Sequence, residues 1–98
     1  MQMKLSHHAR ERMQQRGSRR GEVALVLAHA DIEVPAGDGC RFLRLSNRAV
    51  AGLFESATAS VQDVERARRL VLLVSRDDRV VTLLKNDPDR RLRGRPVR

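Results

Sequence analysis

S-H-H-A-R-E-R-M-Q-Q-R-G, residues 6–17, is the stretch around which this chain is organised. It predicts one short helix with a defined start and a defined end. Ser6 suits the N-cap position because its hydroxyl accepts a hydrogen bond from a free backbone N–H group. Gly17 suits the left-handed residue that ends a helix. Apolar side chains recur every four residues and form a narrow stripe, made up of Leu5, Ala9 and Met13.

The same helix carries a second stripe, which is polar. His8, Arg12 and Arg16 are also spaced by four residues, so their side chains lie along one edge of the helix. A titratable imidazole beside two permanent cations suits a site that binds and works on a phosphodiester. The alternative is an ordinary basic surface helix, in which His8 bonds to the backbone and both arginines are solvated. The sequence leaves these two interpretations open.

The composition is strongly basic. The chain has 98 residues, which predicts one domain, and its net charge is +8, from 20 Lys+Arg against 12 Asp+Glu. Nearly all the cations are arginines, which favour bidentate contacts with phosphate or carboxylate groups. Nucleic acid or an acidic protein is therefore the expected partner. The absence of Trp and Tyr argues against a base-stacking platform of the single-strand-binding type.

Other features bear on metal binding and location. Cys40 is the only cysteine, so a disulfide framework and a cysteine-based zinc site are both excluded. His7 and Glu11 supply only two ligands at helical spacing, so neither a metal nor another cofactor is predicted. The N-terminus lacks the apolar core of a signal peptide, and the longest apolar run, residues 70–74, is too short to span a bilayer. These features predict a soluble, cytoplasmic protein that does not act at a membrane.

The rest of the chain predicts three more helices and four strands. Periodic apolar positions and serine caps indicate the helices, over residues 19–29, 46–56 and 61–69, with caps at Ser18, Ser46 and Ser60. The strands are predicted over residues 32–35, 41–45, 70–75 and 79–85. Residues 70–74 are apolar throughout, as in a buried central strand, and the short turn that follows predicts an antiparallel hairpin. The predicted helix end at residues 66–69 carries three arginines, whose positive charges interact favourably with the negative end of the helix dipole.

These elements predict an α+β fold for residues 1–86, as a single domain. An N-terminal helical hairpin or corner packs on a small, mostly antiparallel sheet, with additional helices in the middle of the chain. Residues 87–98 contain two prolines and five arginines without periodicity, which predicts a basic, disordered tail.

Two motifs resemble a known family, the one catalogued as domain of unknown function 4258. Its members begin H-A-x-x-R-M-x-x-R-G, which matches residues 8–17 here, and its last strand reads V-V-T-V or similar, which resembles V-V-T-L at residues 80–83. The two motifs lie at opposite ends of a region of residues 5–86. An apolar residue usually follows the glycine in the family, whereas this chain has Ser18.

That family is similar to toxins of the RelE/ParE type and to small metal-independent ribonucleases that share their fold. The resemblance implies two helices packed against an antiparallel sheet. It also implies RNA cleavage in some members, with a histidine in the first helix and a polar residue on the last strand. Carried over to this sequence, those catalytic residues are His8 and Thr82, with Arg12 and Arg16 beside them as the RNA-binding cations.

The sequence supports three functional hypotheses. The favoured one is a RelE/ParE-like toxin that acts as a metal-independent endoribonuclease on RNA. The second is a non-catalytic basic module that binds RNA, DNA or an acidic partner, and the third is a ParE-like toxin that acts through protein contact. Toxins of this kind usually pair with an antitoxin, often acidic, so RNA and an acidic antitoxin are the expected partners.

Overall fold

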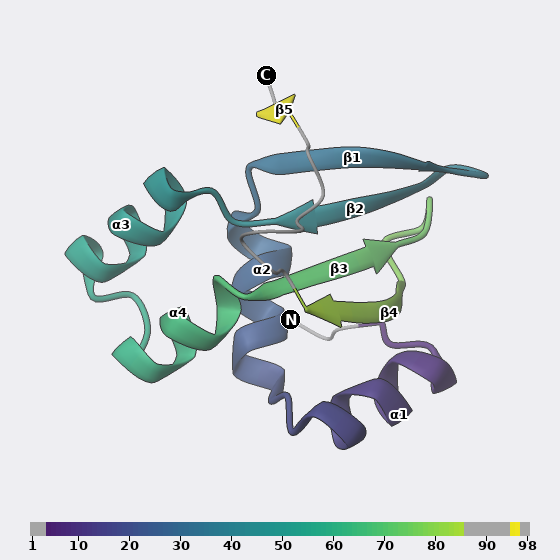
Figure 1. The fold of residues 1–98 in the computed structure, drawn as a ribbon, viewed down its shortest axis with the longest axis horizontal. Coiled ribbons are helices and arrows are strands. Elements are labelled where there is room, and N and C mark those ends of the chain that lie inside the picture. Colours follow the sequence, from purple (N-terminus) through teal and green to yellow (C-terminus); the bar gives the residue numbers. More distant parts are fainter. Residues whose placement is uncertain (1–3, 86–94, 97–98) are drawn as a thin grey trace.

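A computed structural model describes residues 4–85 and 95–96 of the chain. Within these residues the fold is α+β, with four helices and one antiparallel sheet of strand order β4-β3-β2-β1-β5 (Figure 1). The predicted fold class is confirmed at this level. Along the chain, the elements are α1 (His7–Arg16), α2 (Arg20–His29), β1 (Ile32–Gly37), β2 (Cys40–Arg44), α3 (Asn47–Ser56), α4 (Val61–Ala67), β3 (Leu70–Val74), β4 (Val80–Lys85) and β5 (Arg95–Pro96).

Helix α1 begins and ends where the sequence predicts. The Ser6 hydroxyl accepts a hydrogen bond from the backbone N–H of Ala9 at 3.0 Å, which satisfies one of the free donors at the helix start. Gly17 ends the helix with φ of 67°, in the left-handed region that favours glycine. Ala9 and Met13 are the buried side chains of α1, so the predicted apolar stripe is its packing face.

The predicted Ser18 cap of α2 is wrong, because the N-cap residue is Arg19. The Ser18 backbone N–H donates instead to the Met13 carbonyl at 2.8 Å, so Ser18 completes the end of α1. The Glu22 carboxylate then reaches back and accepts from the Arg19 backbone N–H at 2.7 Å. Because α1 lies along β4 while α2 packs on β3 and against α4, the two helices form a corner and not a hairpin (Figure 1).

The first two strands form a tight hairpin. Its turn residues, Asp38 and Gly39, both have positive φ, 55° and 78°, which matches the twist of the flanking strands. Strand β1 continues beyond its predicted end at Pro35, as far as Gly37. Strand β5 pairs with β1 at Ile32 and Glu33, and Pro35 lies opposite Arg41 of β2.

The core lies between the sheet and the helices. Leu72 on β3 and Leu83 on β4 face each other across the predicted hairpin, and both are fully buried. Helix α2, behind the sheet in Figure 1, and helix α1 supply the opposite wall. The buried apolar cluster consists of Leu5, Ala9, Met13, Val23, Leu25, Val26, Leu45, Val50, Leu53, Val64, Ala67, Leu70, Leu72, Val74, Val80 and Leu83.

The segment before α1 is attached to the outer edge of β4. Leu5 and Val80 form a parallel bridge, in which the Ser6 backbone N–H donates to the Val80 carbonyl at 2.9 Å. The Val80 N–H donates in turn to the Lys4 carbonyl at 2.7 Å, and the Ser6 hydroxyl donates to the Val81 carbonyl at 2.7 Å. These bonds fix the start of α1 beside β4.

Asp31 connects the end of α2 to the start of α3. Its carboxylate accepts the Ser46 backbone N–H at 2.8 Å and the Ser46 hydroxyl at 2.5 Å. The same hydroxyl accepts from the Ala49 N–H at 3.0 Å, so Asp31 orients the predicted cap of α3.

Asp31→Ala is expected to lower the free energy of unfolding by about 2 kcal/mol, because two donors of Ser46 lose a charged acceptor. Urea denaturation measures this. Glu55→Ala, on the exposed face of α3, removes the same charge at a site that has no hydrogen bond and is expected to change stability by about 0.5 kcal/mol or less. Equal effects of the two substitutions would contradict the role given to Asp31.

Two further predictions concern the membrane and the tail. Across the described residues, no helix combines the length and the apolar character needed to cross a membrane. The predicted tail at residues 87–98 lies outside the described residues except for β5, which extends the sheet beyond β1 and was not predicted.

Candidate functional site

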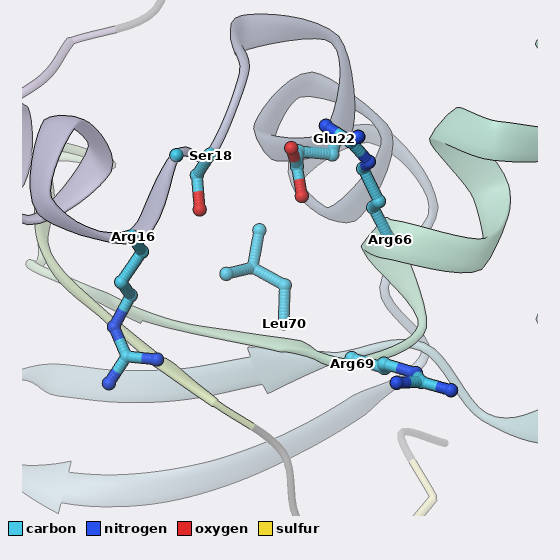
Figure 2. A pocket seen from close by; sticks show the side chains of 7 residues that line it. Arg16, Ser18, Glu22, Arg66, Arg69 and Leu70 are labelled. Carbon is cyan, nitrogen blue, oxygen red and sulfur yellow. The ribbon is translucent and has the colours of Figure 1, made fainter.

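A cavity of about 450 Å³ opens where α1 ends, α2 begins and α4 leads into β3 (Figure 2). Four separate elements therefore meet at it. The residues that line it are Arg16, Gly17, Ser18, Glu22, Arg66, Arg69 and Leu70. They combine three guanidinium groups, one carboxylate, one hydroxyl and an apolar floor.

The three arginines reach the cavity from different directions. Arg16 lies in the last turn of α1, Arg66 in the last turn of α4, and Arg69 in the turn before β3. All three are exposed, and within the described ranges none forms an ion pair with a carboxylate. Their donors are therefore available to an anion, and the planar guanidinium suits bidentate contact with phosphate.

Other arginines of the chain are used differently. Arg41 forms ion pairs with Glu33 at 3.0 Å and with Asp78 at 2.6 Å, and so connects β1, β2 and the turn before β4. Arg68 pairs with Glu65 at 2.9 Å on the outside of α4. In that turn, the Ser75 hydroxyl donates to Asp77, and this hydrogen bond lowers the pKa of the Asp77 carboxyl. The cavity arginines differ from these in that none of them forms an ion pair within the described residues.

Glu22 is the buried charged side chain of this region. It is 5% exposed, and no other polar or charged side chain in the described residues is classed as buried. Its Oε1 accepts from the Arg19 backbone N–H at 2.7 Å, which fixes the orientation of the carboxylate. Figure 2 shows the Glu22 carboxylate and the Ser18 hydroxyl directed toward the space beside Leu70, which is itself 4% exposed.

The predicted cationic stripe of α1 reaches the cavity only at its end. Of His8, Arg12 and Arg16, the last lines the cavity, Arg12 is half-buried, and His8 is exposed in the first turn. At the helical rise, His8 lies about 12 Å from Arg16 along the α1 axis. The stripe therefore leads away from the cavity, and His8 is accessible to solvent rather than sealed in the core.

Thr82 lies on β4, opposite Leu73 and half-buried. Its neighbour Leu83 faces the helix-side core, so Thr82 faces the other side of the sheet. Because α1 packs along β4, the helix that carries His8 and the strand that carries Thr82 are neighbours. The cavity lining includes neither residue, and a joint His8–Thr82 site stays a prediction.

Sequence analysis missed four of the polar residues of the cavity. The sequence predicts only a role in the helix dipole for Arg66 and Arg69, it predicts a cap at Ser18, and it predicts no role for Glu22. The sequence offers one indication for Arg66 and Arg69, because both come shortly before residues 70–74, the strand that is predicted to be buried. Nothing in the local sequence of Glu22 distinguishes a buried carboxylate from an exposed one in the first turn of a helix.

The described residues contain no group of three or more His, Cys, Asp or Glu side chains arranged to hold a metal ion. Comparisons with protein-family models, with curated proteins and with solved structures give no match.

Proposed function

We propose that this protein is a RelE/ParE-like, metal-independent endoribonuclease that binds the RNA backbone at the arginine cavity and along α1. One observation carries the proposal. Three arginines that form no ion pair within the described residues line one cavity, at the end of the helix that carries His8. The α+β fold with an antiparallel sheet is compatible with the resemblance of the two sequence motifs to this group of toxins.

In this proposal, the cavity and the helix have separate tasks. Arg16, Arg66 and Arg69 contact phosphates of the RNA backbone around the cavity, and the strand continues along α1 past Arg12 toward His8. The separation of about 12 Å between Arg16 and His8 along the helix leaves room for more than one nucleotide between them. The site that binds the backbone most strongly is then distinct from the site of cleavage.

The proposed reaction is an internal transesterification. The 2′-oxygen of the ribose attacks the adjacent phosphorus, forms a new P–O bond and gives up its proton to a base. The bond from phosphorus to the 5′-oxygen breaks, and that oxygen receives a proton from an acid. His8 serves as the base or the acid, since an imidazole nitrogen can accept or donate a proton. Arg12 stabilises the charge that develops on the phosphorane oxygens. Because Thr82 faces the other side of the sheet from α1, no step of this reaction is assigned to it.

A non-catalytic RNA- or DNA-binding module is the second candidate. It is favoured by the position of His8 outside the cavity.

The third hypothesis, contact with a protein target, differs from both in its salt dependence. Phosphate binding weakens steeply as salt rises, whereas a hydrophobic protein contact does not. In the first and third cases an acidic antitoxin is the expected partner, and it would cover the exposed arginines.

His8→Ala is expected to slow RNA cleavage by about 100-fold or more, since general acid–base catalysis contributes at least this much. RNA affinity should change by less than about threefold, because no guanidinium is removed. The measurements are cleavage of end-labelled RNA in the presence of EDTA, and fluorescence anisotropy for binding.

His29→Ala is the matched control, because His29 is also an exposed histidine but lies at the far end of α2 from the cavity. It should leave both cleavage and affinity unchanged. Cleavage by His8→Ala at the rate of the unmodified protein would exclude His8 as the acid or base. Tight, salt-dependent binding without any cleavage by the unmodified protein would favour the non-catalytic module.

A further inference from the structure

The cavity wall combines charges of opposite sign, which a plain phosphate site does not need. Arg16, Arg66 and Arg69 attract an anion, whereas the Glu22 carboxylate repels one. Glu22 is also the one charged residue that is classed as buried among the residues described, so its charge is poorly screened by water. A ligand that fits this wall carries an anionic group for the arginines and hydrogen-bond donors for the carboxylate.

The orientation of Glu22 is fixed before any ligand enters. Its Oε1 accepts the Arg19 backbone N–H at 2.7 Å, which holds the carboxylate in place at the start of α2. An ionised carboxylate only accepts hydrogen bonds, and each of its two oxygens has two acceptor positions. The carboxylate therefore keeps acceptor positions for two adjacent donors of a ligand.

From this arrangement, we infer that the cavity takes one unpaired guanine nucleotide of the RNA and that Glu22 is the residue that selects the base. The inference rests on the proposed RNA-binding function. Guanine presents two neighbouring donors, N1–H and the N2 amino group, to a carboxylate. Adenine and cytosine each present one amino group beside a ring acceptor, and uracil presents one N–H between two carbonyl oxygens. The acceptor atoms of adenine, cytosine and uracil repel the carboxylate, so guanine is the RNA base that offers it two neighbouring donors.

The remaining parts of the cavity agree with a nucleotide. The guanidinium groups provide donors for the phosphate, and the Ser18 hydroxyl is a donor or an acceptor for the ribose. Leu70, 4% exposed at the floor, offers an apolar contact for the face of the base. The volume of about 450 Å³ lies in the range of pockets that hold small ligands.

The test measures binding of guanosine, inosine and uridine 5′-monophosphates and of inorganic phosphate by isothermal titration calorimetry. The unmodified protein is expected to bind the guanosine nucleotide about tenfold more tightly than the inosine nucleotide, which lacks the N2 amino group. It should bind the uridine nucleotide more weakly still, and at the same level as inorganic phosphate. This comparison needs no variant, so it does not depend on any substitution folding correctly.

Glu22→Gln then assigns the preference to a residue. The amide oxygen of glutamine still accepts from the Arg19 N–H, so the start of α2 is retained. Its amino group replaces one acceptor by a donor, which should reduce the preference for guanosine over uridine nucleotide to about threefold or less. Binding of inorganic phosphate should become tighter, because a negative charge has been removed. Glu55→Gln on the exposed face of α3 makes the same change of charge away from the cavity and should change neither.

The outcomes separate this inference from the proposed function. Equal affinity for guanosine and uridine nucleotides, with RNA binding still dependent on the cavity arginines, would overturn the role of Glu22 and leave the RNA site intact. Failure of the unmodified protein to bind any nucleotide or RNA would overturn both. Retention of the guanine preference in Glu22→Gln would show that another group reads the base, and would also reject the inference.

Discussion

Replacing Arg16 and Arg69 together with alanine is expected to weaken RNA binding by about 100-fold, or roughly tenfold for each charged hydrogen-bond donor that is lost. Both side chains line the cavity from different elements, and neither is held by a carboxylate in the described structure. Fluorescence anisotropy with a short single-stranded RNA measures the affinity. The slope of log affinity against log salt should also become shallower by about 1.4, because each phosphate contact to a single strand contributes about 0.7.

The matched control removes two arginines that lie outside the cavity. Arg10 on α1 and Arg48 on α3 are both exposed, and neither lines the cavity. The double substitution Arg10→Ala and Arg48→Ala lowers the net charge by the same amount, so it tests whether charge alone determines affinity. It is expected to weaken binding by about threefold or less. Equal losses in the two double variants would mean that RNA binds to the basic surface as a whole and not at the cavity.

Leu72→Ala is expected to lower the free energy of unfolding by about 3 kcal/mol and the melting temperature by about 15 °C. Leu72 is fully buried on β3 and lies opposite Leu83, which is also fully buried, so truncation leaves a cavity between the sheet and the helices. A domain of this size has only about 5–15 kcal/mol of stability in total, so the loss is a large share of it. Urea denaturation and thermal unfolding followed by circular dichroism measure the two quantities.

Val61→Ala is the matched control for this substitution. Val61 is 66% exposed at the start of α4, so removal of its methyl groups should change stability by about 0.5 kcal/mol or less. A loss below about 1 kcal/mol for Leu72→Ala would mean that the sheet and the helices are not packed as the structure has them. The same measurement on the cavity variants shows whether lost RNA binding results from lost folding.

The parts of the fold that depend on local sequence could be predicted. Ser6, Gly17, Ser46 and Ser60 occupy the cap positions assigned to them, because a cap uses hydrogen bonds within three or four residues. The apolar run of β3 also identified an interior strand of the sheet, which lies between β4 and β2. Ser18 was misassigned because the end of α1 and the start of α2 compete for the same residue, and the backbone bond to Met13 decides between them.

The candidate site was predicted only in part, because it depends on contacts between distant segments. Arg16 could be found from its helical stripe, but Arg66 and Arg69 come from α4 and the turn after it, about fifty positions later. They reach the cavity because α2 and α4 pack closely. A methyl group on Gly21 would lie 3.1 Å from a carboxylate oxygen of Asp63. Gly21 on α2 therefore lies close to the Asp63 side chain on α4, a contact between distant segments that no periodic pattern reveals.

The attachment of residues 4–6 to β4 also has a consequence for solubility. β4 is the outermost strand on its side of the sheet, and an uncovered outer strand is a template on which other chains can add strands. The bonds from Lys4 and Ser6 to Val80 occupy the backbone groups at the start of that strand. Removal of Lys4, Leu5 and Ser6 would free them and favour intermolecular aggregation, so this segment covers part of the outer strand as well as positioning the helix.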